Sequence, residues 1–158
     1  MKTTILVFLM IIGLSSESFA CECNKLIWAE WNKEDVKESM EFNDVIFIAE
    51  LVSVNKDYYE FKVLEVFKGK LKKNEIIKGF YLTSCSGWPK KQRTGEWIFY
   101  GHYEQDENDE KILNYSQCGP TRSLCHPPIY TKEQNIEYWN TELEMLNNKF
   151  NKKVNLKL

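Results

Sequence analysis

Two stretches decide the fold of this chain: DVIFIAELVSV, from Asp44 to Val54, and YYEFKVLEVFKG, from Tyr58 to Gly69. In the first stretch every second residue from Val45 to Leu51 is apolar, and this two-residue period is typical of a β-strand. Ile46 and Ile48 give the opposite face of the strand apolar residues at the same end. The short turn NKD separates the two stretches, so together they predict a long β-hairpin.

The second stretch changes phase part of the way along. Phe61 and Val63 alternate regularly, and the apolar residues then move to Leu64 and Val66. A strand shows this shift when it contains a bulge or curls into a barrel.

Three further strands are predicted downstream, at EIIKGFYL (Glu75–Leu82), GEWIFYGHY (Gly95–Tyr103) and KILNYS (Lys111–Ser116). The acidic loop EQDENDE joins the last two. Five strands with a curled second strand predict a mainly β protein built on a small closed sheet.

Two amphipathic helices flank the strands. NKEDVKESME (Asn32–Glu41) is predicted to be a short helix with Asn32 as its N-cap. TKEQ (Thr131–Gln134) is a capping box that opens a longer C-terminal helix. The apolar stripe of that helix consists of Ile136, Trp139, Leu143, Leu146 and Phe150. We expect the stripe to pack on the barrel, and a partner-binding helix is the alternative.

The amino terminus resembles a secretory signal peptide. Lys2 precedes the apolar core ILVFLMIIGL, which is too short to span a bilayer as a helix. Ser18 and Ala20 are the small residues that precede a cleavage site, so residues 1–20 would be removed and Cys21 would come first. The alternative is a lipoprotein signal, in which Cys21 is acylated, although Ser18 stands where that signal normally has Leu.

Charge and cysteine content narrow the classes of function. The net charge is -2 and argues against a nucleic-acid partner, and no apolar segment after the leader could cross a membrane. The five cysteines, at 21, 23, 85, 118 and 125, predict disulfides with one thiol left over, and their spacing leaves the pairing open. Their spacing does not suit a structural zinc site. His102 lies at a predicted strand end, and the neighbours Cys125 and His126 would point their side chains apart in an extended segment. Without a nucleophile and its base, the chain is not predicted to be an enzyme.

The order of several motifs in this chain resembles the order found in bacterial proteins similar to tissue inhibitors of metalloproteinases. The set begins with Cys-x-Cys at the mature terminus and continues with a short helix and the two hairpin strands. It then runs through SCSG (84–87), GEWIFYG (95–101) and YSQCGPTRSL (115–124). The resemblance implies a five-stranded OB-fold barrel of the netrin-like kind over residues 21–128. The cysteine-rich second domain of the family is missing here, and the predicted C-terminal helix with a polar tail, at 129–158, takes its place. It also implies two disulfides, Cys21–Cys85 and Cys23–Cys118.

The same resemblance implies a function. In the inhibitors that this chain resembles, the first cysteine chelates the zinc of a target protease through its α-amino and carbonyl groups. Carried over here, the inhibitory residues are Cys21, Glu22, Cys23, Cys85 and Ser86. The zinc would belong to the target metalloprotease, and no cofactor is expected in this chain. Because Glu22 would enter a substrate pocket that usually takes a small or apolar residue, matrix-type proteases are expected to be poor targets.

A rival interpretation is a noncatalytic binding module, secreted to the extracellular space or periplasm or anchored to the envelope by lipid. Its disulfides would be structural only. Its contacts would come from barrel loops or from Trp28, Trp31 and Trp88, although the first two could equally be core. Acylation of Cys21 would leave four cysteines and would permit Cys85 to pair with Cys125.

Overall fold

The computed structural model describes residues 23, 27, 29–80, 85–87, 89, 95–105, 111–125 and 130–156. The predicted leader, Cys21, Glu22, Trp28 and Trp88 lie outside these residues, as does most of the acidic loop before Lys111.

Five strands close into a barrel, which confirms the predicted fold class. The strands are β1 (Val45–Val54), β2 (Tyr58–Lys68), β3 (Ile76–Phe80), β4 (Glu96–Gln105) and β5 (Lys111–Asn114). Their order around the barrel is β1-β2-β3-β5-β4, and antiparallel pairing of β1 with β4 closes it. The β3–β5 pair is parallel. This arrangement is consistent with an OB-like barrel. A sixth strand that was not predicted, β6 (Arg122–Ser123), pairs with β4.

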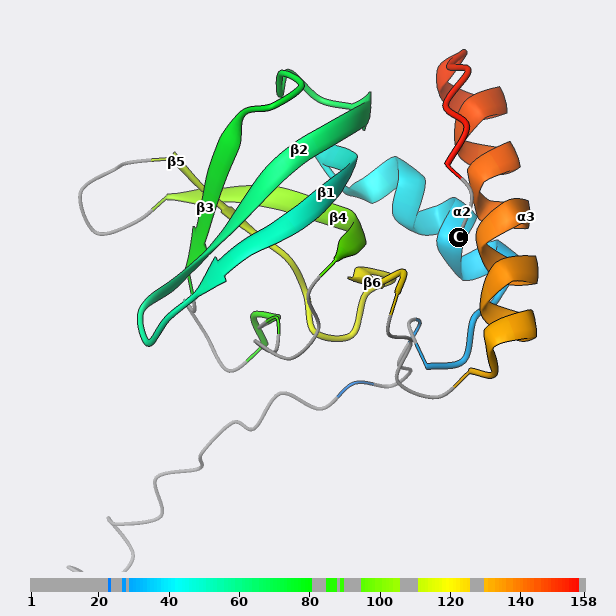
Figure 1. Cartoon of the computed structure of the whole chain (residues 1–158), viewed down its shortest axis with the longest axis horizontal. Coiled ribbons are helices and arrows are strands. Elements are labelled where there is room, and N and C mark those ends of the chain that lie inside the picture. Colours follow the sequence, from blue (N-terminus) through cyan, green and yellow to red (C-terminus); the bar gives the residue numbers. More distant parts are fainter. Residues whose placement is uncertain are drawn as a thin grey trace, which may run out of the picture.

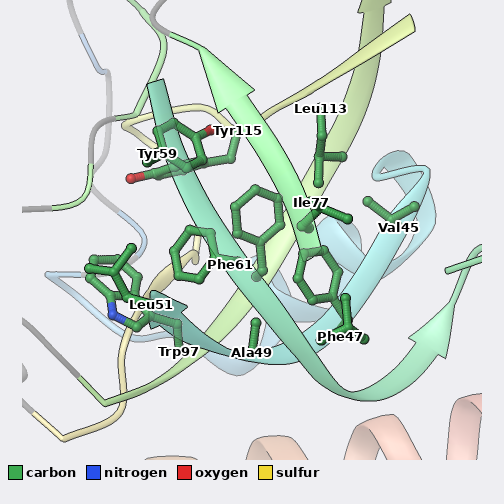
Figure 2. Close-up of a cluster of buried hydrophobic side chains, with 12 residues drawn as sticks. Val45, Phe47, Ala49, Leu51, Tyr59, Phe61, Ile77, Trp97, Leu113 and Tyr115 are labelled. Carbon is green, nitrogen blue, oxygen red and sulfur yellow. The ribbon is translucent and has the colours of Figure 1, made fainter. Parts of the chain in front are cut away.

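The barrel interior is filled by apolar and aromatic side chains from all five strands (Figure 2). Phe61 and Phe99 are both fully buried in it, with 5.5 Å between their ring centroids. The cluster comprises Val45, Phe47, Ala49, Leu51, Tyr59, Phe61, Val63, Ile77, Trp97, Phe99, Leu113 and Tyr115. Strands β1 and β4 contribute every second residue to it, as a two-residue period requires.

The predicted phase shift in β2 is confirmed. Ala49 pairs with Val63 and Ile48 pairs with Glu65, so Leu64 is an extra residue between them. Val63 belongs to the interior cluster, whereas Leu64 packs against the cluster outside the barrel. A bulge of this kind increases the local twist and lets a long hairpin curl toward closure.

Two helices cover the outer wall of the barrel (Figure 1). They are α2 (Lys33–Phe42) and α3 (Lys132–Phe150). The N-cap at Asn32 and the capping box of Thr131 with Gln134 both form as predicted. This outer cluster joins Ile46 and Ile48 of β1 to Val36, Met40, Phe67, Ile98, Tyr100, Leu124, Trp139, Leu143 and Leu146. The predicted packing of the C-terminal helix on the barrel is therefore confirmed.

The chain after α3 folds back along the helix. Asn151 adopts a left-handed conformation with φ of 52° and ends the helix. The Asn147 side chain then bonds both the N–H and the carbonyl oxygen of Val154, at 2.9 Å each. Trp139 Nε1 donates to the carbonyl oxygen of Leu156 at 3.0 Å. Val154 and Leu156 thereby join the outer cluster, although this segment was predicted to be a polar tail.

Candidate functional site

One disulfide fixes the start of the described chain to the barrel. Cys23 is bonded to Cys118, with 5.6 Å between their Cα atoms and a sequence separation of 95. Cys118 lies between β5 and β6, and its carbonyl oxygen accepts a hydrogen bond from the Ile27 N–H at 3.1 Å. The predicted Cys23–Cys118 bridge is thus present. We call residues 23–31 the N-terminal arm, of which the structure describes residues 23, 27 and 29–31.

Cys85 and Ser86 lie beside the same part of the barrel. The Gln117 N–H donates to the Cys85 carbonyl at 3.0 Å, and Ser86 forms a β-bridge with Ser116. Ser86 is only 3% exposed, and its hydroxyl accepts a hydrogen bond from the Asn114 side chain at 2.9 Å. The SCSG and SQCG motifs are therefore neighbours in space.

The predicted Cys21–Cys85 bridge involves Cys21, which lies outside the described residues. Cys85 is itself disulfide-bonded. Cys125 is a free, exposed thiol, so the alternative Cys85–Cys125 pairing is not formed.

A cavity of about 490 Å³ lies beside the Cys23–Cys118 bridge. The bridge and Ile27 line one part of it, and Asp35, Ser39 and Asn43 of the α2 region line another. Tyr100, Ser116, Gly119 and Pro120 complete its lining. The arm therefore lies against the barrel and α2 rather than extending freely into solvent.

Trp31 ties the arm to the C-terminal helix region through three contacts. Its backbone N–H donates to the Tyr130 hydroxyl at 2.7 Å, and its Nε1 donates to Glu142 Oε2 at 3.2 Å. Its ring stacks on Tyr138 with centroids 4.9 Å apart and planes 8° apart. Trp31 is half-buried and packs against the outer cluster, so it belongs to the periphery of the core.

Glu142 is the centre of a buried polar network. Its carboxylate is fully buried and accepts from Arg122 Nη2 at 2.5 Å, from the Tyr100 hydroxyl at 2.7 Å and from Trp31 Nε1. Arg122 Nη1 donates to the Pro120 carbonyl at 3.2 Å. The network thus joins α3, β4, β6 and the arm at one point.

The network also changes the ionisation of its members. Burial, and then the neighbouring Glu142 charge, raise the pKa of Tyr100 well above its ordinary value. Burial alone would lower the pKa of Arg122, but the Glu142 carboxylate outweighs it and the Arg122 pKa is raised. Arg122 is therefore a permanent buried cation that needs its counter-charge.

Sequence reasoning missed both Glu142 and Arg122. Glu142 lies three residues after Trp139 and four before Leu146, on the same face of α3. Glu142 could have been identified because it is a charged residue within an apolar stripe. Arg122 had no comparable signal, because its burial follows from the docking of α3 onto β6.

The described residues contain no cluster of side chains suited to a metal ion. Among the described residues no group of three His, Cys, Asp or Glu side chains could hold a metal ion. His102 Nε2 lies 2.8 Å from Glu104 Oε1 on the same strand. His126 lies outside the described residues. Within the part of the chain that the structure describes, no helix is long and apolar enough to cross a membrane.

Comparison with known proteins does not assign the chain to a family. No protein-family model matches the chain, and no curated protein is significantly similar to it. A function for the candidate site is therefore argued from the geometry of the anchored arm and from the cysteine motifs of the sequence.

Proposed function

We propose that this chain is a secreted protein like the tissue inhibitors of metalloproteinases, and that it inhibits a zinc endopeptidase through Cys21. The α-amino nitrogen and carbonyl oxygen of a first-residue Cys21 would bind the target's zinc as a five-membered chelate ring. Zinc catalysis needs an open coordination position for water, so filling that position blocks the nucleophile.

The observation that supports this proposal best is the anchorage of the arm two residues after Cys21. The Cys23–Cys118 bridge and the hydrogen bond from Ile27 to Cys118 hold the arm against one barrel loop. Anchorage before binding reduces the entropy that is lost when a ligand group is fixed in a complex. A rigid N-terminal ligand is what chelation of a target's zinc requires.

The deciding experiment compares two forms of the purified mature protein. One begins at Cys21, and the other carries a single extra Ala before Cys21. Both are assayed against a panel of zinc endopeptidases. We expect inhibition only from the form that begins at Cys21, because the extra residue removes the amine from the chelate ring. Equal inhibition by both forms, or none by either across the panel, contradicts the proposal and favours the noncatalytic binding module.

Intact mass of the exported protein provides an independent test. Cleavage after Ala20 without modification predicts the mass of residues 21–158 with its disulfides formed. A lipid increment on Cys21 would remove the free amine and therefore the proposed mechanism.

The pH dependence provides a third test. An ordinary terminal amine has a pKa of about 7.7 to 8.0, and only its neutral form binds zinc. Inhibition by the form that begins at Cys21 should therefore weaken roughly tenfold per pH unit below about pH 7. The measurement is the inhibition constant against pH, corrected for the protease's own pH profile.

A further inference from the structure

A second pocket, of about 490 Å³, lies between the arm and the N-terminal end of α3. Ala29, Glu30, Trp31 and Asn32 form one wall, and Tyr130, Gln134 and Tyr138 form the other. Its volume is in the range of about 300–1,000 Å³ that is usual for ligand pockets. We propose that this pocket binds an arginine side chain presented by a protein partner.

The aromatic wall is held in place before any ligand arrives. Trp31 is fixed by Tyr130, Glu142 and Tyr138, as described above. Tyr130 also packs edge-on against Tyr138, with 5.0 Å between the ring centroids and 79° between the planes. Three half-buried rings that are already ordered lose little entropy on binding, and Trp and Tyr are frequent energetic centres of protein interfaces.

The charge of the pocket selects the ligand. Of the described residues that line it, only Glu30 is charged. Glu30 is exposed and forms no ion pair with any part of the chain that the structure describes. One free carboxylate beside electron-rich ring faces favours a cation over a neutral or anionic group.

An anion is further disfavoured because the nearby helix N-termini are already capped. At α2 the N–H groups of Glu34 and Asp35 donate to the Asn32 side chain. At α3 the Gln134 N–H donates to the Thr131 hydroxyl. These backbone donors, which would otherwise attract an anion, are occupied.

Arginine fits these features better than lysine does. Its planar guanidinium stacks on aromatic rings and pairs with a carboxylate through two parallel hydrogen bonds. Its three-carbon stem can lie along the apolar parts of Trp31 and Tyr138 while the charged end reaches Glu30. The ligand is therefore a basic peptide segment of a partner and not a small anion.

The test is a titration of the mature protein with two short peptides, acetyl-Ala-Arg-Ala-amide and the same peptide with citrulline. Citrulline has nearly the shape of arginine but no charge. Binding is followed by the amide and indole N–H resonances of the labelled protein. We expect the arginine peptide to shift the Trp31 indole and Gln134 signals with weak affinity, and the citrulline peptide to leave them unchanged.

Substitution of Glu30 sharpens the test. Glu30→Gln should weaken binding of the arginine peptide roughly two- to fivefold, which is the usual cost of losing one exposed charge pair. Glu34→Gln is the matched control, because Glu34 is an exposed neighbour that does not line the pocket. Tyr138→Leu keeps an apolar contact but removes a ring, and it should also weaken binding. The spectrum of each variant reports whether it is folded.

Three results would overturn the proposal: no shift at Trp31, equal binding of the citrulline peptide, or no effect of Glu30→Gln. Binding of arginine at this pocket does not require the proposed zinc chelation by Cys21. A protein with one extra Ala before Cys21 should bind the arginine peptide unchanged, so the two proposals can fail separately.

Discussion

The barrel interior and the interface between the barrel and α3 are both buried, but they are built differently. The members of the interior cluster are apolar or aromatic, and neither of the buried charged side chains among the described residues belongs to it. The interface adds to its apolar cluster an arginine, a glutamate and an asparagine, each less than 5% exposed. The comparison shows two ways of filling buried space in one small protein.

The difference follows from how each region is connected. Strands of the barrel are held in register by backbone ladders, so the interior needs only side chains of suitable volume. Helix α3 has no ladder to the barrel. Directional contacts can set its position instead: Glu142 binds β4, β6 and the arm, and the Asn135 side chain donates to the Leu124 carbonyl at 2.7 Å. We infer that these polar contacts fix the register of α3.

The largest expected effect comes from removing the central carboxylate. Glu142→Ala leaves Arg122 buried without a counter-charge, and it should lower the free energy of unfolding by about 3–5 kcal/mol in urea titrations. Glu144→Ala, at an exposed position of the same helix, should change it by less than about 0.5 kcal/mol. Replacing both charged partners, with Glu142→Leu and Arg122→Met, should recover only part of the loss, because Tyr100 and Trp31 also lose their acceptor. Adding Tyr100→Phe to that double variant should recover more, and no recovery in either variant would mean that the ion pair itself stabilises the interface.

The next effect concerns the hydroxyl of Tyr100. Tyr100→Phe removes a hydrogen bond to a buried carboxylate and should cost roughly 1.5–3 kcal/mol at pH 8. The wild-type pKa of Tyr100 is raised, so the folded chain keeps the phenol neutral where the unfolded chain ionises it. Stability from this group is therefore complete below about pH 10 and falls as the pH rises further. The gap between wild type and variant should shrink between pH 8 and pH 11, and a constant gap would contradict this account.

The barrel interior is tested by overpacking it. A Cβ atom at Gly79 would lie 2.1 Å from Cζ of Tyr59, inside the cluster. Gly79→Ala should therefore destabilise the fold by about 1–3 kcal/mol. At Gly119 the nearest atom to an added Cβ is 3.4 Å away, so Gly119→Ala is the matched control and should be nearly neutral. Equal urea midpoints for the two variants would show that the interior can relax around Tyr59.

The smallest effect is at the start of α3. Thr131→Ala removes the capping box and should cost about 1 kcal/mol. Thr141→Ala is the control, because the Thr141 hydroxyl only donates back to the Glu137 carbonyl of its own helix. Amide exchange in the first turn of α3 should accelerate in the first variant alone. Unchanged exchange there would mean that docking on the barrel, and not the cap, holds this turn.

The site could be predicted only in part. Cys23–Cys118 came from a resemblance in motif order, and the structure contains it. Cysteine spacing alone had left the pairing open, because any two cysteines on a flexible chain can meet. The pocket at Trp31 was not predicted, since its two walls are about 100 residues apart in sequence and meet only when α3 docks.

By itself, the sequence determined the local elements of this protein. The two-residue period, the phase shift at Leu64, the caps at Asn32 and Thr131 and the stripe of α3 are properties of neighbouring residues, so they could be recognised without a fold. Only the tertiary structure decided the parallel pairing of β3 with β5, the return of the C-terminal segment along α3, and the burial of Arg122 against Glu142. The strand pair and the ion pair join residues far apart in the chain, so their free energy exists only once the barrel has closed and the helix has docked. The returning segment makes contacts closer in sequence, but Val154 and Leu156 pack against an outer cluster that only the docked helix completes.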